Sequence, residues 1–389
     1  MYKYAASYLQ NAKQIIEAYA PNIPFAAFLK QYFAANKKFG SKDRKAITQA
    51  CYAFFRIGNS EQSIDVETKI LIGLFLTDKN LVNWQHVLPN NWINGLNWHI
   101  NEKIDFLQKQ NILSSSFSPF SWKNEVTASI NFNNFSGSHL QQPNSFIRIR
   151  NGFEHKILSK INALPINVQV IDKTLAFQEN FDVHSFAILN KEVVVQDYSS
   201  QQIATLLQLI PSTNHRKKVW DCCAASGGKS ILAVDVLGKI DLYVSDLRES
   251  ILHNLKKRLA VAQISIQNCE VKDLSKPHRS GTVFDVIIAD VPCTGSGTWG
   301  RTPENLVYFK QDEIINFQQL QQKIISNTIP SLKPNGYYLF ITCSVFVKEN
   351  EENVQFIQQK FGLQLIHQQY FVGFEKKADT LFGALFIKS

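Results

Sequence analysis

The chain is short of the features that mark secreted, membrane-spanning and zinc-stabilised proteins. Its 389 residues include six cysteines and no Cys-x-x-Cys pair, which argues against a disulfide scaffold or a structural zinc site. Residues 1–20 are amphipathic and lack the apolar core of a signal peptide. The longest apolar run, Ile70–Leu76, is too short to span a bilayer. We expect a cytoplasmic protein with reduced thiols, no bound metal and no membrane partner.

Charge is sparse and unevenly distributed. Charged residues make up 19% of the chain and hydrophobic residues 45%, which is typical of a globular protein. The formal net charge is +9, and residues 1–60 hold nine lysines and arginines against two acids. Such a run can be a solvated face, but a basic surface is also the electrostatic footprint of nucleic-acid binding. The charge therefore favours an acidic partner.

The first part of the chain, residues 1–112, has the apolar spacing of helices. Ser41 is the expected N-cap of the third helix and Gly58 lies near its end. Cys51 falls on an apolar stripe and is expected to be buried. The other stripes that predict helices are Tyr8, Leu9, Ala12, Ile15, Ile16 and Tyr19; Phe28, Leu29, Tyr32 and Phe33; Ile47, Phe54 and Phe55; and residues 66–76.

A linker and a small mixed subdomain are expected next. Residues 113–144 contain two polar stretches, 114–118 and 131–144, which read as connecting loops. Residues 145–198 read as a small α+β subdomain. Its predicted strands are 146–150, 168–171 and 193–196, and its predicted helix is 154–163.

Residues 199–389 alternate between short apolar strands and helices, which predicts an α/β fold with a doubly wound, mainly parallel sheet. The tail, residues 380–388, supplies a late strand that is expected to enter antiparallel. The predicted strands are 218–222, 241–245, 266–271, 283–289 and 336–342, and the predicted helices are 230–237, 249–262, 311–332 and 349–360.

The segment Val219–Ser230, VWDCCAASGGKS, joins the first of these strands to a helix. Such a junction presents backbone N–H groups to a ligand. The dinucleotide pattern G-x-G-x-x-G is absent. A phosphate-binding P-loop fits Gly228, Lys229 and Ser230 but places Cys223 where its first glycine belongs, with Asp290 as a magnesium-binding strand end.

S-adenosylmethionine is the other candidate ligand, and the P-loop interpretation of an ATPase stays open beside it. The turn and the helix N-terminus would hold its methionine part. Asp246, after the second strand, would accept hydrogen bonds from the ribose hydroxyls, and Asp273, after the third, would hold the adenine amino group. Asp246 can also be read as a helix cap and Asp273 as a surface acid.

Four motifs occur in order along the second half of the chain: DCCAASGGKS, SDLRES, ADVPCTGSGTWGRTPE and ITCSVFVKENEENV. Together they resemble the RsmB/Nop/Sun family of RNA cytosine-5 methyltransferases over residues 190–389. VVVQDYSSQQIA is similar to that family's lead-in, and FIRIRN resembles its small RNA-recognition-like subdomain. KFGSKDRKAITQACYAFFR faintly resembles a NusB-like helical RNA-binding domain. Ser226 departs from the pattern, because the family usually has proline there.

The resemblance implies a monomeric Rossmann-like methyltransferase that transfers a methyl group from S-adenosylmethionine to carbon 5 of cytosine in RNA, with rRNA before tRNA as substrate. It assigns Cys343 as the nucleophile that adds to carbon 6 of cytosine and Cys293 to product release. Asp290 would bond to ring nitrogen 3, and Lys229 would support the cluster. The implied cofactor-binding residues are Cys223, Ala224, Ala225, Ser226, Gly227, Gly228, Lys229, Asp246, Asp273 and Asp290.

Three alternatives remain open at this level. DNA cytosine-5 methyltransferases use a Pro-Cys pair like Pro292–Cys293 as nucleophile, which would leave Cys343 structural. A non-catalytic RNA-binding or ribosome-assembly factor could keep the cofactor fold. Trp299 and Tyr308 could stack on a flipped base or belong to the core.

Overall fold

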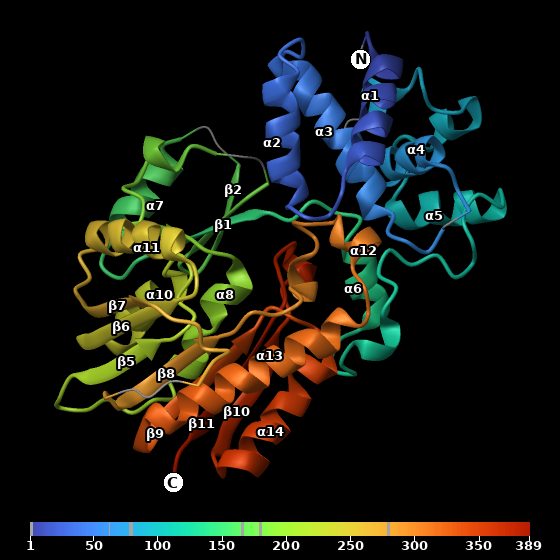
Figure 1. The fold of residues 1–389 in the computed structure, drawn as a ribbon. Coiled ribbons are helices and arrows are strands. Elements are labelled where there is room, and N and C mark those ends of the chain that lie inside the picture. Colours follow the sequence, from blue (N-terminus) through green and yellow to red (C-terminus); the bar gives the residue numbers. More distant parts are fainter. Residues whose placement is uncertain (1–2, 62, 78–80, 165–166, 179–180, 278–280) are drawn as a thin grey trace. The chain divides into compact units, whose positions relative to one another are not determined.

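The computed structural model describes residues 3–61, 63–77, 81–164, 167–178, 181–277 and 281–389. The chain forms two compact units (Figure 1). The first comprises Met1–Asn124, Asn131–Gln142 and Trp299–Lys310, and the second comprises the remaining residues. The sequence-based boundaries at 1–112, 113–144, 145–198 and 199–389 stay a prediction.

The first unit is helical, and its helices follow the aromatic stripes of the sequence. Side chains from α1, α3 and α4 form one buried core with Trp84 and Trp92. In α4, Gly73 lies against the backbone of α3, where a Cβ would come within 2.1 Å of the Ala53 carbonyl oxygen. The predicted burial of Cys51 is confirmed. The helices are α1 (Ala5–Ala18), α2 (Phe25–Ala35), α3 (Ser41–Arg56), α4 (Val66–Thr77), α5 (Ile100–Lys109), α6 (Phe132–Ser138) and α12 (Asn305–Tyr308).

Two expectations for this region are wrong. Ser41 is the first residue of α3 rather than its cap; the N-cap is Gly40, whose N–H donates to the Asp43 carboxylate at 2.9 Å. The stretch 131–144, expected as a loop, contains α6, which begins with Asn131 accepting from the Asn134 N–H. Asn131 caps this helix, and because most of its other residues are Asn, Ser and Gly, the sequence shows no apolar periodicity that would predict a helix.

The segment Trp299–Lys310 is built into the first unit although it follows the Cys293 motif in sequence. The buried Arg56 guanidinium donates to the carbonyl oxygens of His139, at 2.7 Å, and Gly300, at 2.9 Å. Glu304 accepts from the Phe25 N–H at 3.1 Å. Trp299 is fully buried and packs on Phe120, so it is a core residue in this structure.

The second unit contains a four-stranded antiparallel sheet in the order β2-β3-β1-β4, together with α7. The predicted strands and helix are confirmed, but β3 was missed because its four residues TLAF offer too short a pattern. The elements are β1 (Ser145–Ile149), α7 (Glu154–Asn162), β2 (Val168–Ile171), β3 (Thr174–Phe177) and β4 (Val193–Val195).

The larger sheet of this unit has seven strands in the order β10-β11-β9-β8-β5-β6-β7. Strands β5 to β9 run parallel, and β11 pairs antiparallel with β9, as predicted for the tail. The strands are β5 (Lys217–Asp221), β6 (Ile240–Asp246), β7 (Ile266–Val271), β8 (Phe284–Asp290), β9 (Leu332–Thr342), β10 (Gln364–Phe371) and β11 (Leu381–Ile387). The half-exposed, polar β10 was not predicted.

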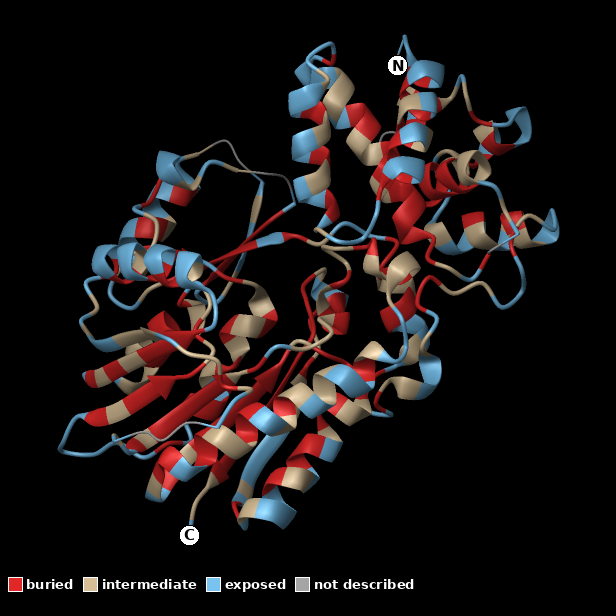
Figure 2. Ribbon diagram, viewed as in Figure 1, coloured by how far each residue is buried: buried red, intermediate tan, exposed pale blue. Residues whose placement is uncertain are grey.

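The strands of this sheet are largely buried (Figure 2), and successive side chains along a strand point to opposite faces. On β5, Val219 packs with α10 and α11 on one face, whereas Trp220 belongs to the core on the other face with α13 and α14. The helices of this unit are α8 (Tyr198–Gln202), α9 (Ala204–Leu207), α10 (Gly228–Leu237), α11 (Glu249–Val261), α13 (Glu313–Thr328) and α14 (Glu351–Phe361). In the described part of the chain, none of the helices combines the length and apolarity of a membrane span.

Candidate active site

The chemically interesting side chains gather at the carboxyl edge of the parallel strands. Strand order reverses between β5 and β8, because β6 and β7 extend the sheet on one side and β9 on the other. Open α/β sheets bind ligands in the crevice outside such a switch point. Asp221, Asp246 and Asp290 are the last residues of β5, β6 and β8.

The turn from β5 to α10 is held in a shape that small residues allow. Ala225 and Gly227 have positive φ angles of 44° and 82°. A Cβ on Gly227 would come within 3.2 Å of Leu255. The Ala224 N–H donates to the Ser245 carbonyl at 2.9 Å, and the Ala225 N–H donates to Asp246 at 3.0 Å. The turn is thereby fixed to the end of β6.

The Ser226 hydroxyl makes a contact that a proline ring could not reproduce. The Arg258 guanidinium of α11 donates to the Ser226 hydroxyl at 3.0 Å and to its carbonyl at 3.1 Å. The same guanidinium donates to Asn190 at 2.7 Å. In this chain, a hydrogen-bonded arginine therefore braces the turn at the position of the expected proline.

The two cofactor acids of the sequence analysis differ in their surroundings. Asp246 is buried and accepts from the Arg248 N–H at 3.0 Å. It is not the N-cap of α11, which is Arg248. Asp273 is partly exposed; hydrogen bonds from the Ser275 hydroxyl and N–H lower its pKa. A backbone bond from the Lys272 N–H to the Asp246 carbonyl, 3.1 Å, ties these two strand ends together.

Asp221 was not among the predicted site residues. It is fully buried, and burial raises its pKa from 3.8 to about 7. Its Oδ2 accepts from the Ser230 hydroxyl at 2.6 Å, whereas Oδ1 has no hydrogen-bond partner among the described residues. A buried acceptor without a donor is rare. Its position as a strand-end acid, shared with Asp246 and Asp290, was the signal that could have identified it.

The two thiols of interest lie together. Cys293 follows β8 and Cys343 follows β9, and their sulfur atoms are 3.1 Å apart. The Cys343 N–H also donates to the Cys293 sulfur at 3.3 Å. The contact with Cys343 and burial raise the pKa of Cys293 well above its ordinary range. Both cysteines are free and partly accessible.

An ion pair lies at the same edge. The Lys229 ammonium, from the first turn of α10, is 3.1 Å from Asp290 Oδ2 and 2.7 Å from the Ser200 hydroxyl. The Lys229 side chain is 11% exposed, whereas that of Asp290 is 31% exposed. Asp290 thus keeps an accessible carboxylate while its charge is balanced by the buried lysine. Ser200 is a second contact that the sequence did not indicate.

The remaining cysteines are placed differently. Cys222 is buried directly after β5, and Cys269 lies half-buried within β7. Cys223 lies in the turn, as expected. Within the part of the chain that the structure describes, no group of three or more His, Cys, Asp and Glu side chains could hold a metal ion.

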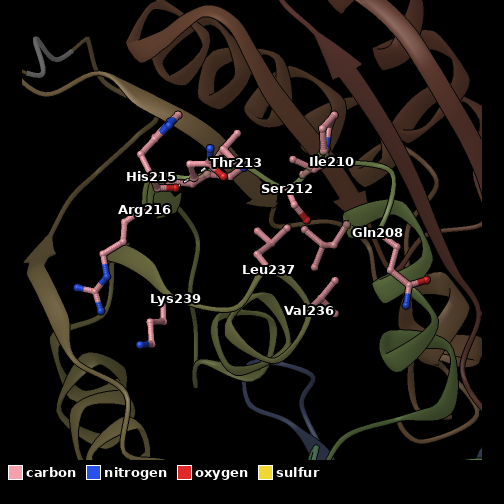
Figure 3. A pocket seen from close by; sticks show the side chains of 13 residues that line it. Gln208, Ile210, Ser212, Thr213, His215, Arg216, Val236, Leu237 and Lys239 are labelled. Atoms are coloured by element: carbon pink, nitrogen blue, oxygen red, sulfur yellow. Dashed lines mark hydrogen bonds between the residues drawn. The ribbon is translucent and has the colours of Figure 1, made fainter.

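A cavity of about 380 Å³ lies at the opposite, amino edge of β5 (Figure 3). Ile210, Val236 and Leu237 form its apolar part, and Arg216 and Lys239 lie on one side of it. It holds none of the predicted site residues. The strand-end acids and thiols, rather than this hollow, therefore define the candidate active site.

The fold is that of Rossmann-like methyltransferase domains, as predicted. Residues 206–380 match the family described as 16S rRNA methyltransferase RsmB/F. This match, which spans the four motifs named above, confirms the resemblance that the motifs predicted.

A curated relative matches part of the chain in sequence. Ribosomal RNA small subunit methyltransferase B of Xanthomonas campestris is 28% identical over 215 residues, which cover 51% of this chain and 48% of that protein. The chain thus matches less than half the length of this relative.

Two crystal structures share the fold. PH0851 aligns over 98% of both chains with a TM-score of 0.69 at 18% identity. NSun6 from Pyrococcus horikoshii, solved with SFG, aligns over 66% of this chain and 94% of its own with a TM-score of 0.56 at 16% identity.

Proposed function

We propose that this chain is an S-adenosylmethionine-dependent RNA methyltransferase that acts on carbon 5 of cytosine. The observation that carries the proposal is the meeting of two free thiols, 3.1 Å apart, beside the Asp290–Lys229 pair at the carboxyl edge of the sheet. A single cysteine is most often a small buried hydrophobe. Two accessible cysteines at neighbouring strand ends require a chemical explanation, and cysteine-mediated methylation gives both of them a task.

The residues of the β5–α10 turn fit the proposed cofactor. The Asp246 carboxylate at the end of β6 is suited to ribose hydroxyls, and Asp273, which follows β7, is proposed to hold the adenine amino group. The unpartnered, buried Oδ1 of Asp221 can accept a bond from the cationic amino group of the methionine part. S-adenosylmethionine, when bound, supplies an electrophilic methyl group.

The proposed chemistry uses Cys343 as the nucleophile. Its thiolate forms a bond to carbon 6 of cytosine, and the electrons of the 5,6 double bond move toward ring nitrogen 3, which takes a proton from the Asp290–Lys229 pair through the Asp290 carboxyl group. Carbon 5 becomes nucleophilic and would take the methyl group of S-adenosylmethionine, whose sulfur would keep the bonding electrons and leave as a neutral thioether. Loss of the carbon 5 proton then drives the electrons back, restores the 5,6 double bond and expels the Cys343 thiolate.

The roles of the two cysteines differ in this scheme. The raised pKa of Cys293 favours its protonated form, which suits a residue that assists product release rather than one that attacks. Lys229 holds Asp290 in position through their ion pair. The target base must leave its stack to reach these groups.

RNA is the proposed partner, with rRNA favoured over tRNA because the sequence relatives are rRNA methyltransferases. The excess of basic residues in the first sixty residues supports docking to a polyanion. We expect the affinity for RNA to fall as salt concentration rises, since phosphate contacts release counterions.

Trapping on RNA that contains 5-azacytidine tests the proposal, because the adduct with this base cannot release the enzyme. Cys343→Ala is expected to abolish the covalent adduct seen on a denaturing gel and to lower methyl transfer by roughly four orders of magnitude or more. Cys293→Ala is expected to let the adduct accumulate. The half-buried Cys269→Ala is the matched control and is expected to behave as the wild type.

Two results would contradict the assignment. Loss of the adduct in Cys293→Ala, with its retention in Cys343→Ala, would make Cys293 the nucleophile. Absence of both adduct formation and transfer of labelled methyl to bulk RNA would favour the non-catalytic RNA-binding alternative. Bisulfite sequencing of rRNA and tRNA with and without the gene would then identify the modified cytosine if the activity is present.

A further inference from the structure

A buried carboxylate lies behind the two thiol loops. Glu349, at the end of the short turn Val347–Glu349 before α14, has no exposed surface. Thr294 follows Cys293 in sequence and Ser344 follows Cys343, and Glu349 binds both. Its Oε1 accepts from the Thr294 N–H at 2.9 Å, and its Oε2 accepts from the Thr294 hydroxyl at 2.6 Å and from the Ser344 hydroxyl.

The surrounding groups complete this arrangement. The Gln321 amide of α13 donates to Glu349 Oε1 at 2.8 Å and to the Pro292 carbonyl at 3.0 Å. Four donors therefore face the two carboxylate oxygens, which is the pattern an ionised carboxylate requires because it can only accept. No lysine, arginine or histidine of the described residues forms an ion pair with Glu349.

Burial raises the pKa of Glu349, and the hydrogen bonds from Ser344, Thr294 and Gln321 oppose this rise by stabilising the charge. A neutral glutamine could join the two loops without burying a charge, although it offers one accepting oxygen where Glu349 offers two. The charge is therefore better explained by its effect on its neighbours. The contact with Cys343 and burial raise the pKa of Cys293 most, and the charge of Glu349 raises it further.

We propose that Glu349 is a positioning residue that fixes the separation of the two thiol loops and keeps Cys293 as the protonated member of the pair. The proposal rests on the proposed cysteine chemistry for its biological purpose. What it states physically is that Glu349 lowers the reactivity of the Cys293 thiol relative to that of Cys343. Cys293 then keeps the proton that its role in product release requires.

The test measures thiol reactivity in the full chain without RNA or cofactor. Limiting iodoacetamide is added near neutral pH, and the alkylation of each cysteine is followed by peptide mass spectrometry. Glu349→Gln preserves size and removes the charge. The ratio of Cys293 to Cys343 alkylation is expected to rise by roughly threefold or more, because a like charge beside the thiolate is lost.

Conservative variants separate charge from packing. Glu349→Asp keeps the charge but has a shorter reach, and the ratio is expected to stay near that of the wild type even if the melting temperature falls. Glu351→Gln is the matched control, since Glu351 accepts from Thr127 and Tyr370 rather than from either thiol loop. Its ratio is expected to be unchanged.

An unchanged ratio in Glu349→Gln, with a lower melting temperature, would overturn the proposal and leave Glu349 a structural brace. If Glu349→Gln fails to fold, Thr294→Val provides the test, because it removes one contact to the carboxylate and is expected to raise the ratio to a smaller extent. A wild-type ratio in Thr294→Val would then count against the proposal. Because alkylation needs no methyl transfer, failure of this inference and failure of the proposed function give different results.

Discussion

Strand β8 carries one aspartate near each end, and each pairs with a lysine. At its amino end, Asp285 is 2.7 Å from the Lys333 ammonium and also accepts from the Lys218 N–H at 2.8 Å. At its carboxyl end, Asp290 is 3.1 Å from the Lys229 ammonium. The two pairs are similar in chemistry and lie on one strand, yet their surroundings differ.

The surroundings indicate which pair serves the fold and which serves a ligand. Asp285 accepts bonds at both of its oxygens, and they join β8 to the starts of β5 and β9. At the carboxyl end, where Asp290 lies, some polar groups lack such bonds. Cys293 and Cys343 are free thiols, and Oδ1 of Asp221 has no hydrogen-bond partner among the described residues. The carboxyl end of the sheet is therefore marked by polar groups that lack hydrogen-bond partners, whereas the amino end is marked by the cavity at β5.

The largest effect is expected at Asp290. Asp290→Asn removes the carboxylate proposed to bond to ring nitrogen 3, so the turnover rate should fall by roughly three orders of magnitude, the scale of acid–base assistance. The measurement is transfer of labelled methyl to RNA under saturating cofactor. Urea unfolding of the variant is the control, because it measures whether the substitution destabilises the fold. If unfolding accounted for the loss of activity, Asp290 would have a structural role like that of Asp285.

A smaller effect, on the pH dependence of stability, is expected at Asp221. The unfolded chain loses this proton near the ordinary pKa of 3.8, whereas burial holds it in the folded protein up to about 7. The folded state thus binds more protons between these values, so this group makes the protein less stable as pH rises through that window. Asp221→Asn should remove this pH dependence, which amounts to about 4 kcal/mol across the window.

Urea unfolding at a series of pH values measures this difference. The free energy of unfolding of Asp221→Asn should rise relative to the wild type between about pH 4 and pH 7 and then stay level. A constant difference across the series would mean that Asp221 is ionised in the folded protein, and the carboxyl end would then hold an unpaired buried charge.

The smallest effect is expected at Asp285. Burial opposes its ionisation, but the bonds from Lys333 and the Lys218 N–H outweigh burial and lower its pKa. Asp285→Asn should cost about 1 kcal/mol of stability near neutral pH, because the pair is partly exposed. The loss should shrink as pH falls through the folded pKa, since the wild type then loses the same charge. Methyl transfer should change less than about twofold; a larger fall would erase the distinction between the two ends.

Much of the fold could be predicted because its apolar patterns are long or regular. The strands β5 to β9 and the helices between them follow runs that the sequence displays openly. Three elements were not predicted because they are polar or very short. Strand β3 has four residues, β10 is half exposed, and α6 consists mainly of Asn, Ser and Phe. Their stability comes from partners distant in sequence.

The candidate site was predicted in part. Strand-end position was enough to select Asp246, Asp290, Cys293 and Cys343, because the carboxyl ends of parallel strands meet at one edge. Ser200 and Glu349 could not be found in this way. Each acts through a contact across at least two elements, and neither residue type nor spacing marks it in the sequence.

The path of the chain after Cys293 bears on how such a protein can be divided. Residues 299–310 complete the helical unit, where Trp299 and Leu306 are fully buried, before the chain returns to the sheet. A cut near residue 124 or 143 would strip these two side chains of the core that covers them. The helical unit therefore cannot be removed or exchanged as one contiguous segment. Doing so would expose the apolar side chains of Trp299 and Leu306, which follow the proposed active-site residue Cys293 closely in sequence.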